Sequence, residues 1–193
     1  CLGTGNQTYA AIFGDPDFSF IAGRVKFVCL NTNAIEYDYS KPIPNFDFME
    51  QEATADKDDF DRSVFCMHAK PYSDQFNNNV AKVFNYYIEQ YPKPLFCLNG
   101  HGHHNNQEDI YKNGIIYYEV CASKFRQYYI FTITPNDYSY EIIDFKIILA
   151  LLGLPLMAQA QCNCHCDSCG SLCTDTVVRN YNIQAASIEK SSR

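Results

Sequence analysis

The chain has no tryptophan, no cluster of basic residues and no long unbroken apolar segment. Its 193 residues carry 15 Lys and Arg against 22 Asp and Glu, a formal net charge of -7. Without a basic surface to neutralise a phosphate backbone, tight nucleic-acid binding is not expected. The longest apolar run, 147–160, is short and contains Pro155, so no membrane span is expected either.

Aromatic residues, by contrast, are abundant, with 15 Tyr and 14 Phe. This composition favours packed strands over disorder. The length is sufficient for one domain with its own core plus an appendage, but a second full domain would be cramped.

The cysteines form two groups. Cys29, Cys66 and Cys97 each lie inside an apolar run, where a free thiol behaves as a small buried hydrophobe. Residues 1–145 show no paired cysteine spacing, which is typical of a reduced, cytoplasmic protein. Five further cysteines crowd into 162–173.

Three short apolar runs predict strands buried on both faces. They are "RVKFVCLN" at 24–31, "RSVFCM" at 62–67 and "PLFCLN" at 94–99. Apolar residues between the second and third runs recur at helical spacing and end before Pro92. A strand, a helix and a strand form a βαβ unit, so we expect an α/β fold with a parallel sheet.

Other elements are expected on both sides of this unit. "FDFMEQEA" at 46–53 predicts a helix. The runs at 114–120, 126–134 and 138–145 are expected to be antiparallel strands that end the domain, with the turn residues "PND" between the last two.

Histidines follow two of the predicted buried strands. His68 comes directly after 62–67, and His101 and His103 lie in the loop "NGHGHH" after 94–99. The carboxyl ends of parallel strands share one edge of a sheet, so the three imidazoles could converge on one cleft. Imidazole suits Zn, Fe, Mn or Ni better than Mg or Ca. A single histidine in such a place is more often a hydrogen-bonded loop residue, so the metal-site hypothesis depends on all three together.

The loop has to turn if its histidines are to act together, because alternate residues of an extended segment point in opposite directions. Gly100 and Gly102 provide that freedom. His104 is expected to be a bystander, since adjacent side chains seldom serve one site.

These motifs together resemble the calcineurin-like metallophosphoesterases. "FCLNGHGHH" is similar to the G-H-x-H motif of that family, and "VFCMHAKPY" to its preceding strand-H-x-x-P block. Upstream, "FGDPDFSFIAGRVKFVCLNTNAIEYD" resembles the step from a Y-S-F strand to an F-x-x-L-N-T strand. The resemblance covers roughly residues 12–144.

The resemblance implies an incomplete metallophosphoesterase-like β-sandwich flanked by helices. It further implies two divalent metal ions of the Mn, Fe, Zn or Ni class, with His68 and His101 on one ion and His103 on the other. The implied activity is hydrolysis of a small phosphate mono- or diester by a metal-bound hydroxide.

Several parts of the family pattern are missing here. The D-x-H, G-D-x-x-D and G-N-H-[DE] blocks are absent, although "TGNQT" places Asn6 as an alternative ligand with Gln7 at the position of the catalytic His. Asp15 and Asp17 are better explained by a turn. The chain also begins without Met, so we expect a carboxyl-terminal portion of the domain that is inactive by itself.

Composition changes near residue 145. Residues 1–145 are expected to form the partial metallophosphoesterase domain, and 146–193 a signal-like apolar run plus a Cys-rich tail outside it. A closing core helix at 147–160 is the alternative reading of the run. The cluster at 162–173 could bind metal adventitiously, carry extracellular disulfides or lie outside any fold. A genuine tail of this kind would indicate export.

A second function class therefore stays open, a non-catalytic metal-binding or secreted module. His68 distinguishes the two classes, because a storage site has no need of a residue from a separate strand end, whereas a two-metal hydrolase does.

Overall fold

The computed structural model describes residues 7–33 and 43–145 of the chain. These residues belong to a unit that runs from Cys1 to Leu156, and a second unit, Met157–Arg193, lies outside the described residues. The expected boundary near 145, the apolar run, the cysteine cluster and the alternative ligand Asn6 also lie outside them.

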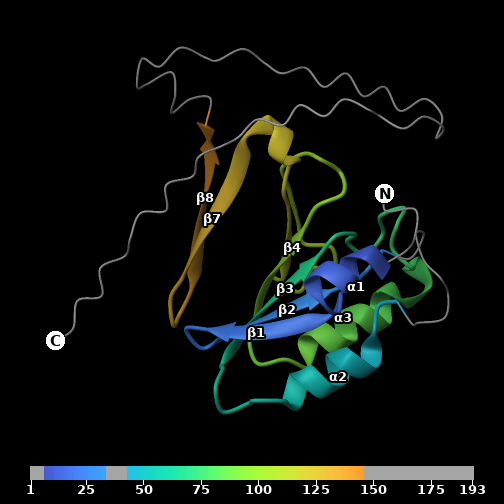
Figure 1. The fold of residues 1–193 in the computed structure, drawn as a ribbon. Coiled ribbons are helices and arrows are strands. Elements are labelled where there is room, and N and C mark those ends of the chain that lie inside the picture. Colours follow the sequence, from blue (N-terminus) through green and yellow to red (C-terminus); the bar gives the residue numbers. More distant parts are fainter. Residues whose placement is uncertain (1–6, 34–42, 146–193) are drawn as a thin grey trace. The chain divides into compact units, whose positions relative to one another are not determined.

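The described residues form a mixed α/β fold with two sheets (Figure 1). In chain order the elements are α1 (Gln7–Phe13), β1 (Phe18–Ala22), β2 (Val25–Leu30), α2 (Phe46–Thr54), β3 (Arg62–Met67), the 3-10 turn η1 (Asn78–Val80), α3 (Ala81–Glu89), β4 (Pro94–Asn99), β5 (Asn106–Glu108), β6 (Ile116–Glu119), the 3-10 turn η2 (Ser123–Phe125), β7 (Gln127–Ile133) and β8 (Tyr138–Asp144).

The larger sheet has the strand order β1-β2-β3-β4-β6-β5. Strands β2, β3, β4 and β6 run parallel, and the edge strands β1 and β5 are antiparallel to their neighbours. The predicted strand, helix, strand unit is confirmed as β3, α3 and β4. The buried strands are apolar almost throughout, as expected for parallel strands covered on both faces.

The expectation that 114–120 belongs to the closing antiparallel group is wrong. β6 pairs with β4 in parallel, and the antiparallel pair at the end of the domain is β7 with β8. The physical reason is burial, because β6 lies inside the sheet between β4 and β5 and both of its faces are covered.

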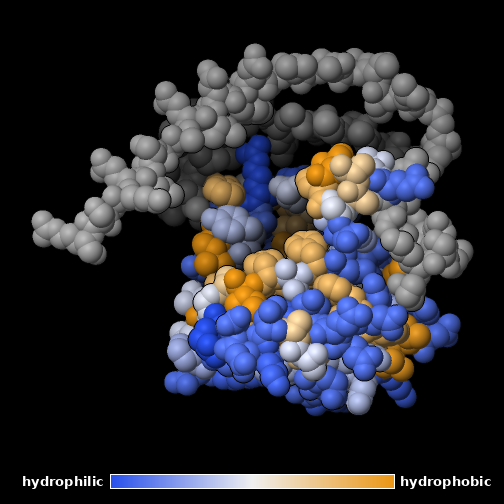
Figure 2. Space-filling view, turned by 60° about the horizontal axis from the view of Figure 1, so that its bottom comes forward, coloured by the Kyte–Doolittle hydropathy of each residue, from blue (hydrophilic) through white to orange (hydrophobic). Residues whose placement is uncertain are grey.

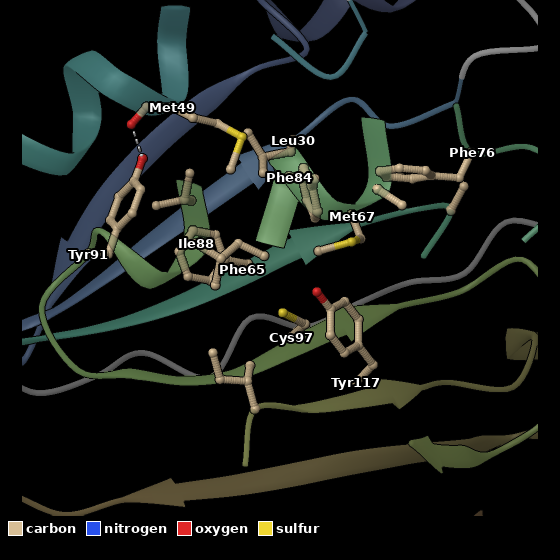
Figure 3. Close-up of a cluster of buried hydrophobic side chains, with 14 residues drawn as sticks. Leu30, Met49, Phe65, Met67, Phe76, Phe84, Ile88, Tyr91, Cys97 and Tyr117 are labelled. Atoms are coloured by element: carbon tan, nitrogen blue, oxygen red, sulfur yellow. Dashed lines mark hydrogen bonds between the residues drawn. The ribbon is translucent and has the colours of Figure 1, made fainter. Parts of the chain in front are cut away.

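Helices α2 and α3 cover one face of the large sheet (Figure 1). The side chain of Asn45 accepts a hydrogen bond from the backbone N–H of Phe48 and so caps the start of α2. Tyr91, just after α3, donates its hydroxyl to the backbone oxygen of Met49 at 2.7 Å, which ties the two helical segments together (Figure 3).

The β7–β8 hairpin covers part of the opposite face. Phe131 stacks on Phe96 of β4 with ring centroids 4.5 Å apart, and Tyr138 lies against the same ring. The turn of the hairpin is held at the start of β3, where the guanidinium of Arg62 donates to the backbone oxygen of Thr134. The sheet therefore lies between a helical layer and a β layer.

A buried ion pair joins the sheet to α2. Lys26 of β2 is fully buried, and its ammonium lies 2.7 Å from the carboxylate of Glu52. The same ammonium donates to the backbone oxygens of Glu52 and Ala55 at the end of α2, where helix carbonyls favour a cation.

The face of the described residues shown in Figure 2 is largely hydrophilic, with apolar residues gathered in patches. In the described part of the chain, no helix has the length and apolar character that a membrane span requires.

Candidate metal-ligand site at the sheet edge

The carboxyl ends of β2, β3, β4 and β6 lie at one edge of the large sheet, because these four strands run parallel. The residues that follow them are Thr32 after β2, His68 after β3, His101 after β4 and Glu119 at the end of β6. Two of the three predicted histidine ligands are therefore delivered to neighbouring strand ends.

His68 and His101 lie against each other at this edge. Their ring centroids are 5.3 Å apart and the ring planes meet at 73°. The backbone holds the two loops together, because the N–H of Gly100 donates to the backbone oxygen of His68 at 3.1 Å. The predicted meeting of histidines from two strands is thus found for this pair.

His103 does not join the pair. It is exposed and makes no hydrogen bond, ion pair or ring contact within the described residues. Its φ is +59°, and that of His101 is +73°, so both residues adopt the left-handed conformation and the loop turns sharply. The predicted turn is therefore present, and it leaves His103 open to solvent.

Gly102 shapes this loop through a close approach. A Cβ at this position would lie 2.0 Å from Oε1 of Glu119 and 2.7 Å from Cε1 of His104. The predicted role was freedom of the backbone, yet the φ of Gly102 is not positive. Only glycine allows the loop to pass so near the buried carboxylate.

Glu119 is a buried carboxylate that sequence reasoning missed. Its side chain is 4% exposed, and its Oε2 lies 3.4 Å from the ammonium of Lys70. Lys70 also pairs with Glu108 at 2.8 Å. A buried charge persists when it is paired, so this ion pair fixes the loop after β3 to the end of β6.

His104 contacts the histidine loop from its solvent-exposed side. Its Nδ1–H donates to the backbone oxygen of Gly102 at 2.8 Å, and its Nε2 lies 3.9 Å from Glu119. These contacts hold the His104 side chain against its own loop and the end of β6.

Asp74 is the direct partner of His101, and nothing in the sequence pattern pointed to it. Its carboxylate lies 2.6 Å from Nε2 of His101, across 27 positions of sequence. The hydrogen bond from His101 lowers the pKa of Asp74. Because the Asp74 side chain is 79% exposed, it can orient the imidazole or move aside for a ligand.

Thr32 holds the loop that carries His68. Its buried hydroxyl donates to the backbone oxygen of Ala69 at 2.7 Å and accepts from the Ala69 N–H at 3.1 Å. At Asn31, the residue before Thr32, the backbone N–H donates a hydrogen bond to the Asp17 carboxylate at 2.7 Å. Asp15 and Asp17 lie in the short segment between α1 and β1, as the turn interpretation predicted.

Several buried polar atoms in these edge loops have no hydrogen-bond partner. Among the described residues they include the side-chain oxygens of Asn33, Ser73, Gln75 and Asn99. Asn99 is 4% exposed and ends β4, beside the histidine loop. An orphaned buried acceptor is costly unless a water, ion or substrate group satisfies it, so its presence here suits a site that takes a ligand.

Within residues 7–33 and 43–145, no three His, Cys, Asp or Glu side chains gather closely enough to form a metal-binding group. The arrangement supplies two adjacent imidazoles, one exposed imidazole on the same loop and an acidic partner. These residues supply only some of the ligands that one metal ion needs, and a second ion would need further ligands as well.

A comparison with models of known protein families gave no match, and neither did a search of curated proteins.

Proposed function

We propose that the domain to which this chain belongs is a metallophosphoesterase that hydrolyses small phosphate mono- or diesters at a dinuclear metal centre. The observation that carries the proposal is the His68–His101 pair, 5.3 Å between ring centroids, at the ends of neighbouring parallel strands. Ligand sites of α/β sheets form at such strand ends.

The architecture supports the same proposal. An incomplete metallophosphoesterase-like β-sandwich would retain a mixed sheet, helices on one face and a few antiparallel strands on the other. The described part of the chain contains this set, with β7 and β8 as the smaller sheet.

The residues present suit divalent ions of the Mn, Fe, Zn or Ni class, because neutral imidazole nitrogen is a good donor to them. His68 and His101 would share one ion, and His103 would reach a second. When bound, such ions polarise a phosphoryl oxygen and make a coordinated water acidic.

The other residues of the site act on these imidazoles. Asp74 fixes the ring of His101 through Nε2, and Thr32 fixes the loop that carries His68. The unpaired oxygen of Asn99 offers an acceptor to a bound water or substrate hydroxyl.

Three imidazoles are fewer than two metal ions require, so ligands from outside the described residues would have to complete the centre. The chain by itself is therefore expected to bind metal and to be inactive in hydrolysis. A non-catalytic metal-binding or secreted module is the competing function, and it predicts metal binding without turnover in the parent protein as well.

The first experiment measures Mn²⁺ binding to the chain by paramagnetic broadening of histidine ring signals. Mn²⁺ is chosen because it prefers nitrogen and oxygen donors to the thiols of the tail. His68→Ala and His101→Ala should abolish the broadening. His104→Ala is the matched control from the same loop and should retain it.

The second experiment measures hydrolysis of aryl phosphate mono- and diesters by the parent protein loaded with Mn²⁺ or Zn²⁺. We expect His68→Ala to lower kcat by about 100-fold or more, while His104→Ala leaves kcat nearly unchanged. Metal binding without any hydrolysis by the wild-type parent would refute the enzymatic function and favour the competing one.

A further inference from the structure

Two cysteines lie side by side on the face of the sheet that carries the hairpin. Cys29 of β2 and Cys66 of β3 are register partners in neighbouring parallel strands. Both are free and half-buried. Register partners in parallel strands present their side chains to the same face of the sheet, so the two side chains are neighbours.

The pair belongs to a row of side chains that crosses the sheet. Phe18 of β1 is the register partner of Cys29, and Leu98 of β4 is the partner of Cys66. Cys66 borders the apolar cluster beneath the hairpin, whereas Phe18 at the other end of the row is 42% exposed. Within the described residues, the Cys29 end of the row is therefore the more open to solvent.

Cys97 in the next strand does not belong to this pair. Its register partner is Phe65, and both residues lie fully buried in the cluster on the helical face of the sheet. Side chains of successive residues alternate between the faces of a sheet, so the Cys97 thiol is separated from the pair by the sheet itself.

We propose that Cys29 and Cys66 are a modification site, at which they form a reversible disulfide by exchange with small disulfides of the glutathione class. Neighbouring strands lie about 4.8 Å apart, and disulfides join Cα atoms separated by roughly 4.4–6.8 Å. The bond can therefore form without separating the two strands. This inference does not depend on the proposed hydrolase function.

The exchange proceeds in two balanced steps. The Cys29 thiolate attacks one sulfur of the small disulfide, and the first small thiolate leaves and takes up the proton from Cys29. The sulfur of Cys66 then attacks the Cys29 sulfur of the mixed disulfide, and the second small thiolate leaves with the proton from Cys66. Two protein thiols are oxidised, and one small disulfide is reduced to two thiols.

Cys29 is the first nucleophile because it lies toward the end of the row that is more open to solvent, whereas Cys66 borders the apolar cluster. A side-chain hydrogen bond with Cys66 lowers the pKa of Cys29, which raises the fraction of thiolate at neutral pH. Partly exposed disulfides are the ones that small thiols reduce again, so the modification is expected to be reversible.

The test equilibrates the folded full chain with mixtures of oxidised and reduced glutathione, blocks the remaining thiols and maps the tryptic peptides by mass spectrometry. Cleavage places Cys29 in 27–57 and Cys66 in 63–82, because the Lys41–Pro42 and Lys70–Pro71 bonds resist trypsin. We expect the linked pair 27–57/63–82 to be the principal disulfide of Cys29 and to disappear when the reduced form of glutathione is in excess.

Unfolding in urea provides the first control. The chain has ten cysteines, so an unfolded Cys29 has nine possible partners, and the linked pair should fall to a minor product. Cys97→Ala is the matched variant from the neighbouring strand and should retain the bond, whereas Cys66→Ser should remove it. Separate glutathione adducts on Cys29 and Cys66 in the folded chain, or bonds from Cys29 to the cysteines of 162–173, would overturn the proposal.

Discussion

The substitution Gly102→Ala tests how the histidine loop is built. The added Cβ would lie 2.0 Å from Oε1 of Glu119 and 3.0 Å from its Cδ. Glu119 cannot simply swing into solvent, because its side chain is 4% exposed and is paired with Lys70 at 3.4 Å. Either the carboxylate gives up this pairing or the loop backbone moves away from the end of β6.

The expected loss of unfolding free energy in Gly102→Ala follows from the loss of a buried charged contact. Disturbing a buried, paired charge costs about 2–4 kcal/mol of unfolding free energy. Gly100→Ala is the matched control two positions earlier, where the nearest atom to an added Cβ is Nδ1 of His68 at 3.8 Å, an ordinary contact. The φ of Gly100 is not positive, so Gly100→Ala should leave the unfolding free energy unchanged or raise it by up to about 1 kcal/mol.

Urea unfolding followed by far-ultraviolet circular dichroism measures both variants, and the absence of tryptophan makes this signal preferable to fluorescence. The Mn²⁺ affinity of each folded variant, measured as described above, should fall for Gly102→Ala alone. Equal unfolding free energies for the two variants would refute the close approach of the loop to Glu119.

Two further predictions concern residues that support the site and the helical layer. Thr32→Val keeps the side-chain shape but leaves the Ala69 N–H and oxygen without partners, so urea unfolding should show a loss of about 2–4 kcal/mol. Burial opposes ionisation of Glu52, but hydrogen bonds from Lys26 and Ser19 outweigh it and lower the pKa below the ordinary 4.5. Because the folded pKa is the lower one, this stabilisation is present above pH 4.5 and is lost as the pH falls through the lowered pKa. The unfolding temperature should therefore fall less steeply with decreasing pH below 4.5 in Glu52→Gln than in the wild type.

The local elements were open to prediction because each depends on a short pattern. Runs of apolar residues predicted β2, β3 and β4, and helical spacing predicted α3 between the last two. Short connections and the right-handed crossover of βαβ units then constrain such strands to lie parallel. The placement of His68 and His101 at one edge follows from this alone.

The sequence could not predict contacts between segments that no short pattern connects. The pairing of β6 with β4 depends on which strand becomes buried inside the sheet. An apolar run gives the same sequence pattern in a parallel and in an antiparallel sheet. Asp74 meets His101 across 27 positions, and an exposed aspartate carries no local signal of its partner.

Gly102 shows most clearly which features follow from the sequence and which from the tertiary structure. The sequence by itself determined that a glycine lies between two histidines in a loop after a buried strand, and glycine there indicates a turn. Only the tertiary structure decided that the turn is needed at His101 and His103, whereas Gly102 is needed because Glu119 approaches its Cα. The reason is physical, since backbone freedom is a property of one residue and steric room is a property of whatever the fold places beside it.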